Sequence, residues 1–153
     1  DSVMLAGLVD SAVVPVLDLA GAYDASLAPN GRTLVLTCTT GHGTTLCTGE
    51  LDTLGVARNL RVLPGMRMDS LLADQAAISP DGQRVAFRGW LPGGPVGLFN
   101  PGDVYVMNLD GSGLERLTNA VRGESSYESP TWSPQPVNGA YRLAYAHERR
   151  SAE

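Results

Sequence analysis

The sequence contains no lysine, and its 11 arginines are outnumbered by 16 acidic residues, which gives a net charge of −5 at pH 7. Nucleic acids and anionic lipid surfaces attract proteins with basic patches, so we expect no nucleic-acid partner. Long apolar runs are also missing, because the apolar segments 3–9 and 12–19 are interrupted by Asp10, Pro15 and Asp18. A membrane-spanning helix needs about 18 apolar residues. The sequence therefore predicts no membrane span.

Residues that commonly carry catalysis or bind metals are scarce. There are only two histidines, His42 and His147, and they are not spaced as a pair of metal ligands. No Gly-x-Ser-x-Gly nucleophile elbow and no phosphate-binding loop in front of a helix occur. We therefore expect no cofactor, no metal and no catalytic residue in this chain of 153 residues, a length that suits one domain.

What the sequence does contain is an internal repeat. A small residue, a proline, a turn containing glycine and a short apolar stretch follow one another in 28–36, in 79–87 and again in 133–145. The marker prolines Pro29, Pro80 and Pro134 recur after 51 and then 54 residues. Asn-Gly and Asp-Gly pairs supply the positive φ angles of tight hairpin turns. Each copy is therefore predicted to contain a β-hairpin.

The second half of the unit is repeated as well. Segments 45–52 and 103–110 both end in Leu-Asp, and each is followed by a turn and an Arg-Leu segment, 58–63 or 114–118. The repeated unit thus consists of four short strands, which we call a, b, c and d in chain order. This pattern, alternating short apolar segments with turn residues, predicts an all-β fold.

The two ends of the chain contain parts of the same unit. Segments 3–9 and 13–19 read as a c and a d strand, and segments 129–133 and 141–146 as an a and a b strand. Two whole units lie between them. The chain therefore contains about three four-stranded equivalents in the order c-d, two full units, a-b.

The second unit resembles a known family. The segments SPDGQRVAF at 79–87, GDVYVMNLDGSG at 102–113 and RLT at 116–118 are similar to the WD-like propeller repeat of TolB-type proteins. The resemblance implies β-propeller blades of four antiparallel strands in a six-bladed ring. It also implies a non-enzymatic protein–protein interaction or cell-envelope binding scaffold that is periplasmic or extracellular. An alternative is the propeller portion of a prolyl-oligopeptidase-like hydrolase whose catalytic domain is absent from this chain.

On this basis we expect residues 1–153 to form a single propeller segment. It would consist of a half blade at 1–20, full blades at 24–63 and 75–118, and a half blade at 129–146. Three blade equivalents are too few for a closed ring, because propellers have four to eight blades and need to protect their edge strands. Either the segment belongs to a longer propeller or another copy completes it, for example in a homodimer with six blades.

The two cysteines, Cys38 and Cys47, lie on the two sides of a predicted hairpin in the first full blade. Opposed strands can bring such side chains within bonding distance. A disulfide would indicate an oxidising compartment, whereas two free, half-buried thiols would suit a cytoplasmic propeller. The spacing favours the disulfide.

Candidate partner-binding residues fall in two places. The segment 90–102 is a long insertion between strands b and c of the second full blade, rich in proline, glycine and apolar residues. It either presents aromatic anchors to a partner or folds back over its own blade. The second place is a charged group just before the last a strand, expected at a channel mouth. Together the candidates are Trp90, Leu91, Leu98, Phe99, Arg122, Glu124 and Glu128.

Overall fold

The computed structural model describes residues 3–6, 13–17, 21–66, 70–93, 101–121 and 124–149, and the regular structure in these ranges is entirely β. No helix in this described part of the chain is long and apolar enough to cross a membrane. The strands are β1 (Val3–Ala6), β2 (Val13–Leu17), β3 (Ala22–Leu27), β4 (Thr33–Thr40), β5 (Gly43–Leu51), β6 (Ala57–Val62), β7 (Leu72–Ile78), β8 (Arg84–Trp90), β9 (Asp103–Asn108), β10 (Glu115–Arg116), β11 (Ser125–Trp132) and β12 (Leu143–Arg149).

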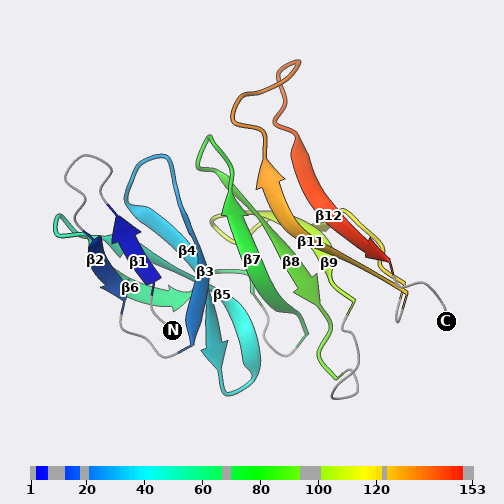
Figure 1. Cartoon of the computed structure of the whole chain (residues 1–153), viewed down its shortest axis with the longest axis horizontal. Helices are drawn as coiled ribbons and strands as arrows, with labels where there is room; N and C mark the ends of the chain where they lie inside the picture. Colours follow the sequence, from blue (N-terminus) through cyan, green and yellow to red (C-terminus); the bar gives the residue numbers. More distant parts are fainter. Residues whose placement is uncertain are drawn as a thin grey trace.

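The strands form four antiparallel sheets. Two sheets are complete blades of four strands in chain order, β3-β4-β5-β6 and β7-β8-β9-β10, and two are pairs, β1-β2 and β11-β12. The sheets follow one another across the molecule from the blue β1-β2 pair to the red β12 strand, and β7 lies between β3 and β11 (Figure 1). The predicted fold class, propeller blades in the order c-d, two full blades, a-b, is confirmed.

The hairpin turns form where the Asn-Gly and Asp-Gly pairs predict them. Gly31 and Gly82 have φ values of +68° and +70°, which glycine adopts without strain. The side chain before each glycine closes the turn, since Asn30 Oδ1 accepts a hydrogen bond from the N–H of Arg32 at 2.9 Å and Asp81 Oδ1 accepts one from the N–H of Gln83 at 3.0 Å. The repeated Asn-Gly and Asp-Gly pairs therefore form turns with the same glycine conformation and the same side-chain hydrogen bond.

The first strand of each blade contains a β-bulge. Asp24, Gln75 and Ser129 have φ values of +49°, +55° and +53°, and the pairing with the second strand shifts register at each of them. The bulges explain a difference from the sequence-based boundaries, which began the blades at these three residues. The strands begin two to four residues earlier, because an inserted residue breaks the alternation of buried and exposed side chains that marks a strand.

The hydrophobic core consists of two clusters. One lies on a face of the β3–β6 sheet and contains Ala22, Leu34, Leu36, Cys38, Cys47 and Leu51. The second joins the two complete blades, because Val35 and Leu46 from the first pack with Val85, Phe87 and Met107 from the second. These five side chains are at most 1% exposed, and full burial of each stabilises the fold by about 1.5–3 kcal/mol. The stacking of the blades is therefore a hydrophobic interface.

Polar contacts between blades lie near the bulges. The Oγ of Ser26 in β3 accepts a hydrogen bond from the N–H of Ile78 in β7 at 3.0 Å. The Nε1–H of Trp132 in β11 donates to the carbonyl oxygen of Ala77 in β7 at 2.9 Å. The first strands of neighbouring blades are thus held in register with one another.

Candidate functional site

Charged and phenolic side chains gather where the first strands of the three blades meet. We call this group the inner polar cluster: Tyr23 and Asp24 from β3, Asp74 from β7, Arg88 from β8 and Glu128 from β11. Asp74 and Arg88 are directly opposed in the β7–β8 ladder, and their side chains form an ion pair at 3.7 Å. Both are largely buried, with 14% and 19% of the side chain exposed.

Burial dominates the electrostatics of this cluster. It raises the pKa of Asp74 to about 6, and the nearby charges of Asp24 and Glu128 add to the shift while Arg88 opposes it. Burial, followed by the charges of Asp74 and Asp24, also raises the pKa of the Tyr23 phenol. The cluster therefore combines one guanidinium with three carboxyl groups, and acidic groups outnumber basic ones in it.

Two polar atoms of the cluster have unused hydrogen-bonding capacity. Asp74 Oδ1 and Arg88 Nε are buried and have no hydrogen-bond partner. Buried polar groups are normally paired, and an unpaired one costs about 1–3 kcal/mol. The interior of the cluster thus contains one acceptor and one donor whose hydrogen bonds are not made. Within the described residues, no group of His, Cys, Asp and Glu is arranged to hold a metal ion.

Trp90 extends the cluster toward the surface. The guanidinium of Arg88 lies over its ring, 5.0 Å from the ring centroid. Such a cation–π contact contributes about 0.5–2 kcal/mol, depending on how well it is shielded from water. The next residue, Leu91, is 72% exposed. Gly102, at the far end of the insertion, packs so closely on Arg88 that a Cβ atom there would collide with the guanidinium.

The structure therefore links two predicted binding residues that lie far apart in the sequence. The ring of Trp90 lies against Arg88, and the charge of Glu128 acts on Asp74, the ion-pair partner of Arg88. Glu124 is exposed and lies in the turn before β11, where its N–H donates to the carbonyl oxygen of Val121 at 3.0 Å. The predicted residues Leu98, Phe99 and Arg122 lie outside the described residues.

Sequence reasoning missed Tyr23, Asp24, Asp74 and Arg88. A signal for three of the cluster's members was available, because Tyr23, Asp74 and Glu128 each immediately precede a bulge residue and recur after 51 and then 54 residues. The same sequence period that predicts the blades therefore also predicts that these three residues occupy equivalent positions in the first strands of neighbouring blades. Arg88 had no such signal, since it occupies an ordinary position in β8.

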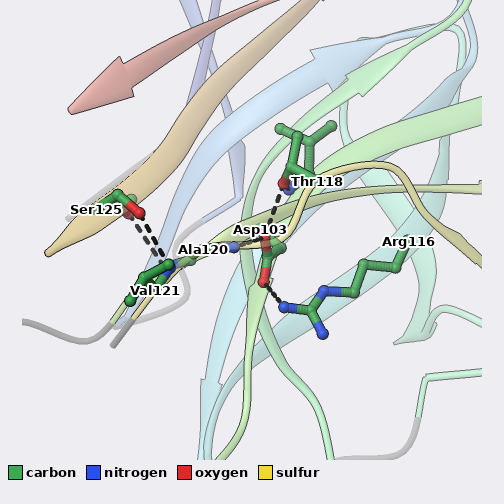
Figure 2. A network of polar contacts seen from close by, with 9 residues as sticks. Asp103, Arg116, Thr118, Ala120, Val121 and Ser125 are labelled. Atoms are coloured by element: carbon green, nitrogen blue, oxygen red, sulfur yellow. Dashed lines mark hydrogen bonds and ion pairs between the residues drawn. The ribbon is translucent and has the colours of Figure 1, made fainter. Parts of the chain in front are cut away.

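A second polar network, around Asp103, has a structural role. Figure 2 shows Asp103 with the side chains of Arg116 and Thr118 directed at its carboxylate. This carboxylate pairs with Arg116 and accepts hydrogen bonds from Thr118 Oγ1 at 2.8 Å and the N–H of Ala120 at 2.7 Å. Val121 continues the connection, because its N–H donates to Ser125 Oγ at 3.0 Å. The network connects β9 with β10 and with the start of β11. Thr118 lies beyond the end of β10, and its hydroxyl donates a hydrogen bond to Asp103.

The two cysteines form a disulfide. Cys38 in β4 and Cys47 in β5 are joined with their Cα atoms 6.0 Å apart, a usual separation for this bond. They are 9% and 6% exposed, respectively, and belong to the apolar cluster of the first complete blade. The bond therefore cross-links the two central strands of that blade inside its core.

Four-stranded antiparallel sheets that stack against one another define a partial β-propeller, and the fold is TolB-like. The chain is similar to the crystal structure of TolB from Acinetobacter baumannii, with a TM-score of 0.62 and 16% identity over 94% of this chain. It is also similar to the structure of a putative TolB from Agrobacterium tumefaciens, with a TM-score of 0.58 and 18% identity over 80% of this chain.

The similarity is one of fold. The chain spans 34% of the length of the Acinetobacter protein and 41% of the Agrobacterium protein, so it corresponds to part of each. No protein-family model matches the sequence, and no curated protein sequence matches it.

Proposed function

We propose that this chain is a non-enzymatic propeller module that binds a protein partner or a component of the cell envelope. The observation that carries the proposal is the continuity of the Asp74–Arg88 pair with Trp90 and Leu91. The largely buried Asp74–Arg88 ion pair is followed toward the surface by the ring of Trp90 and then by the exposed side chain of Leu91. Arg and Trp are among the residues that contribute most to protein–protein binding.

The chemistry of the inner polar cluster supports a polar or charged ligand group at its centre. Asp74 Oδ1 lacks a hydrogen-bond donor and the Nε–H of Arg88 lacks an acceptor, and the excess of carboxyl groups in the cluster favours a cationic ligand group beside it. Leu91, 72% exposed, supplies an apolar group at the rim of the cluster. A peptide segment with a basic residue beside apolar ones matches both features.

We further propose that the module works in the periplasm or outside the cell. The Cys38–Cys47 disulfide supports this location, since such bonds persist in oxidising compartments and are rare in the cytosol. The TolB-like fold is consistent with the same location.

The experiment compares two apolar side chains that are equally exposed on different blades. Leu91 is 72% exposed beside the inner polar cluster, and Leu54 is 73% exposed in the turn after β5. Tagged wild-type, Leu91→Asp and Leu54→Asp chains are incubated with an envelope extract of the source cells, and the captured proteins are quantified by mass spectrometry.

We expect one protein to be captured by the wild-type and Leu54→Asp chains and to be reduced at least tenfold with Leu91→Asp. That reduction corresponds to a loss of about 1.4 kcal/mol of binding free energy. An Arg88→Gln chain should show the same loss, because the guanidinium that orients Trp90 is removed. Capture that is unaffected by both variants would refute binding at this surface.

A further inference from the structure

Two aspartates of the second complete blade are buried in very different surroundings. The carboxylate of Asp103 pairs with Arg116 and accepts hydrogen bonds from two further donors. Asp74 Oδ1 is buried without a hydrogen-bond partner, and Asp74 Oδ2 lies 3.7 Å from Arg88 Nη1. A hydrogen bond between nitrogen and oxygen is usually about 2.7–3.2 Å long. The negative charge of Asp74 is therefore supported by one long ion pair, whereas that of Asp103 is supported by close donors.

The strands packed against β7 bring mainly acidic groups toward Asp74. β4 and β5 contain one acid, Glu50, which accepts a hydrogen bond from Thr33 Oγ1 at 3.0 Å near the end of β5. In β11, Tyr127 stacks on the ring of His147 with centroids 4.3 Å apart. The ionisable groups beside Asp74 are Tyr23 and Asp24 in β3, Arg88 in β8 and Glu128 in β11. Burial, with the charges of two of these acids, raises the pKa of Asp74 to about 6, and only Arg88 opposes the shift.

The side chain of Arg88 is held by two contacts in the described part of the chain. One is the ion pair with Asp74, and the other is the cation–π contact with the ring of Trp90. The Nε–H of Arg88 has no acceptor. The backbone of Gly102 packs against this guanidinium, but its carbonyl oxygen accepts from the N–H of Tyr127 at 2.8 Å. When Asp74 is neutral, only the ring of Trp90 is left to hold a largely buried cation.

We propose that Asp74 is a proton-controlled switch for the position of the Arg88 guanidinium. The ionised carboxylate holds the guanidinium over the Trp90 ring, and uptake of one proton from solvent by Asp74 frees the guanidinium from the ring. Asp24 and Glu128 then remain as its counter-charges. The ion-paired arrangement of the structure is the state above the transition, because the pair needs an ionised Asp74. The switch is a property of the free chain and goes beyond partner binding.

The chain offers a matched pair of contacts for testing the switch by fluorescence. Its two tryptophans each lie under an arginine, with Arg88 5.0 Å from the ring centroid of Trp90 and Arg84 5.1 Å from that of Trp132. A Trp132→Phe chain has Trp90 as its only tryptophan, and a Trp90→Phe chain has Trp132. The emission spectrum of each is recorded from about pH 7.5 to about pH 4.5, a range that brackets the transition.

The expected result is a one-proton change in the emission of Trp90, with its midpoint at the pKa of Asp74, about 6. Adding Asp74→Asn to the Trp132→Phe chain should abolish this change, because an amide does not ionise. That double variant keeps His42 and His147, which also titrate near this pH in many proteins. A change that depends on Asp74 is therefore distinguished from one caused by a histidine.

The emission of Trp132 is the control. The acid beside Arg84 is Asp81, which is exposed, and a hydrogen bond from Ser79 lowers its pKa. Asp81 therefore stays ionised over the range of the titration, and we expect the emission of Trp132 to stay constant in the Trp90→Phe chain. A cation–π contact beside a buried acid and one beside an exposed acid are thus compared in the same fold.

Three results would overturn the switch: an unchanged Trp90 emission, a Trp90 curve that persists with Asp74→Asn, or the same curve for Trp132. If the Trp132→Phe chain does not fold, the Nε–Hε NMR signal of Arg88 in the wild-type chain provides the titration. This signal is identified by its absence in an Arg88→Lys chain. We expect it to shift with the same midpoint, and a constant position would refute the proposal.

A consequence for binding rests on the proposed function and is tested separately. Freeing Arg88 removes the group that orients Trp90 beside Leu91, so capture from the envelope extract by the wild-type chain should fall severalfold from about pH 7.5 to about pH 5. Capture by the Asp74→Asn chain should not depend on pH. Equal wild-type capture at both pH values would refute this regulation. A failure to capture any protein would refute the proposed function and leave the fluorescence result unchanged.

Discussion

The two complete blades stabilise the same pair of central strands in different ways. In the first, the Cys38–Cys47 disulfide joins β4 to β5. In the second, the equivalent positions are Gly89 in β8 and Tyr105 in β9. The Tyr105 ring stacks on Phe87 with centroids 5.6 Å apart, and Gly89 leaves the space that the ring occupies. The disulfide of the first blade is thus replaced in the second blade by the packing of the Tyr105 ring over Gly89.

The second blade has a further element that the first lacks. Asp103 starts β9 at the position that Thr45 occupies in β5, and its carboxylate holds Arg116, Thr118 and Ala120. Thr45 is completely buried, and its hydroxyl has no hydrogen-bond partner. The blade that has the disulfide therefore does without the polar network. The blade that contains the long insertion between its central strands relies on that network.

The largest effect is expected from removing the Asp103 carboxylate. Asp103→Ala leaves the N–H of Ala120 and the hydroxyl of Thr118 without their acceptor, and we expect a loss of about 3 kcal/mol of unfolding free energy. Arg116→Gln serves as the control. Its side chain is 45% exposed, so we expect a loss of about 1 kcal/mol or less. Urea denaturation measures both, and equal losses would contradict the assignment of Asp103 as the centre.

Reduction of the disulfide should have the next largest effect. The cysteines are nine residues apart, and opening a loop of this size removes about 2–3 kcal/mol of stability in the chain-entropy model. The measurement is the urea midpoint with and without a reductant. A Cys38→Ala, Cys47→Ala double variant should show no response to the reductant. If the wild-type midpoint does not move either, the covalent link is not what stabilises the first blade.

Adding a methyl group at Gly89 tests the packing of Tyr105 over this glycine, the contact that takes the place of the disulfide in the second blade. A Cβ atom there would lie 2.9 Å from Cδ2 of Tyr105, closer than such atoms normally approach. We expect Gly89→Ala to lower the unfolding free energy by about 1–2 kcal/mol through overpacking. Gly41→Ala is the matched control, because no atom lies within 4 Å of the added carbon. A Gly89→Ala chain as stable as wild type would show that the tyrosine ring can move aside.

The smallest effect concerns the pH dependence of the second blade. The folded-state pKa of Asp74 is raised to about 6 from an ordinary 3.8, so proton binding stabilises the folded chain. This stabilisation is complete below about pH 4 and is lost as the pH rises through about 6. Asp74→Asn should therefore gain about 1–2 kcal/mol over wild type between pH 4 and pH 7, because its side chain never ionises.

The control for that measurement is an acid with the opposite shift. Hydrogen bonds from Ser112 hold the pKa of Asp110 below its ordinary value. The stability difference between wild type and Asp110→Asn should therefore stay constant from pH 5 to pH 7 and change only at lower pH. Thermal unfolding at each pH gives both differences. A flat Asp74→Asn difference would show that water reaches the carboxylate.

Much of the fold could be predicted because its signals are local. Asn30-Gly31 and Asp81-Gly82 mark turns through their own backbone preferences, and the Leu-Asp steps end strands because Asp52 and Asp110 cap the turns that follow. The pairing of Cys38 with Cys47 follows from the same short hairpin.

The inner polar cluster could not be predicted in this way. Asp74 and Arg88 meet across a register that depends on the bulge at Gln75, and a residue with positive φ has no reliable signal in a single sequence. The charge of Glu128 acts on Asp74 only because the blades stack, and stacking brings together residues far apart in the sequence. In the sequence, Trp90 stands out by its loop position and Glu128 by its charge, and only the stacking of the sheets links them.

The three bulges also have a consequence for the engineering of this chain. Asp24, Gln75 and Ser129 have the same backbone conformation at the same point of their repeats. The segment from one bulge to the next is therefore one structural repeat unit, which we call a cassette. Duplicating or deleting the 24–74 cassette preserves the backbone at both splice points. Each such step would lengthen or shorten the chain by one four-stranded blade.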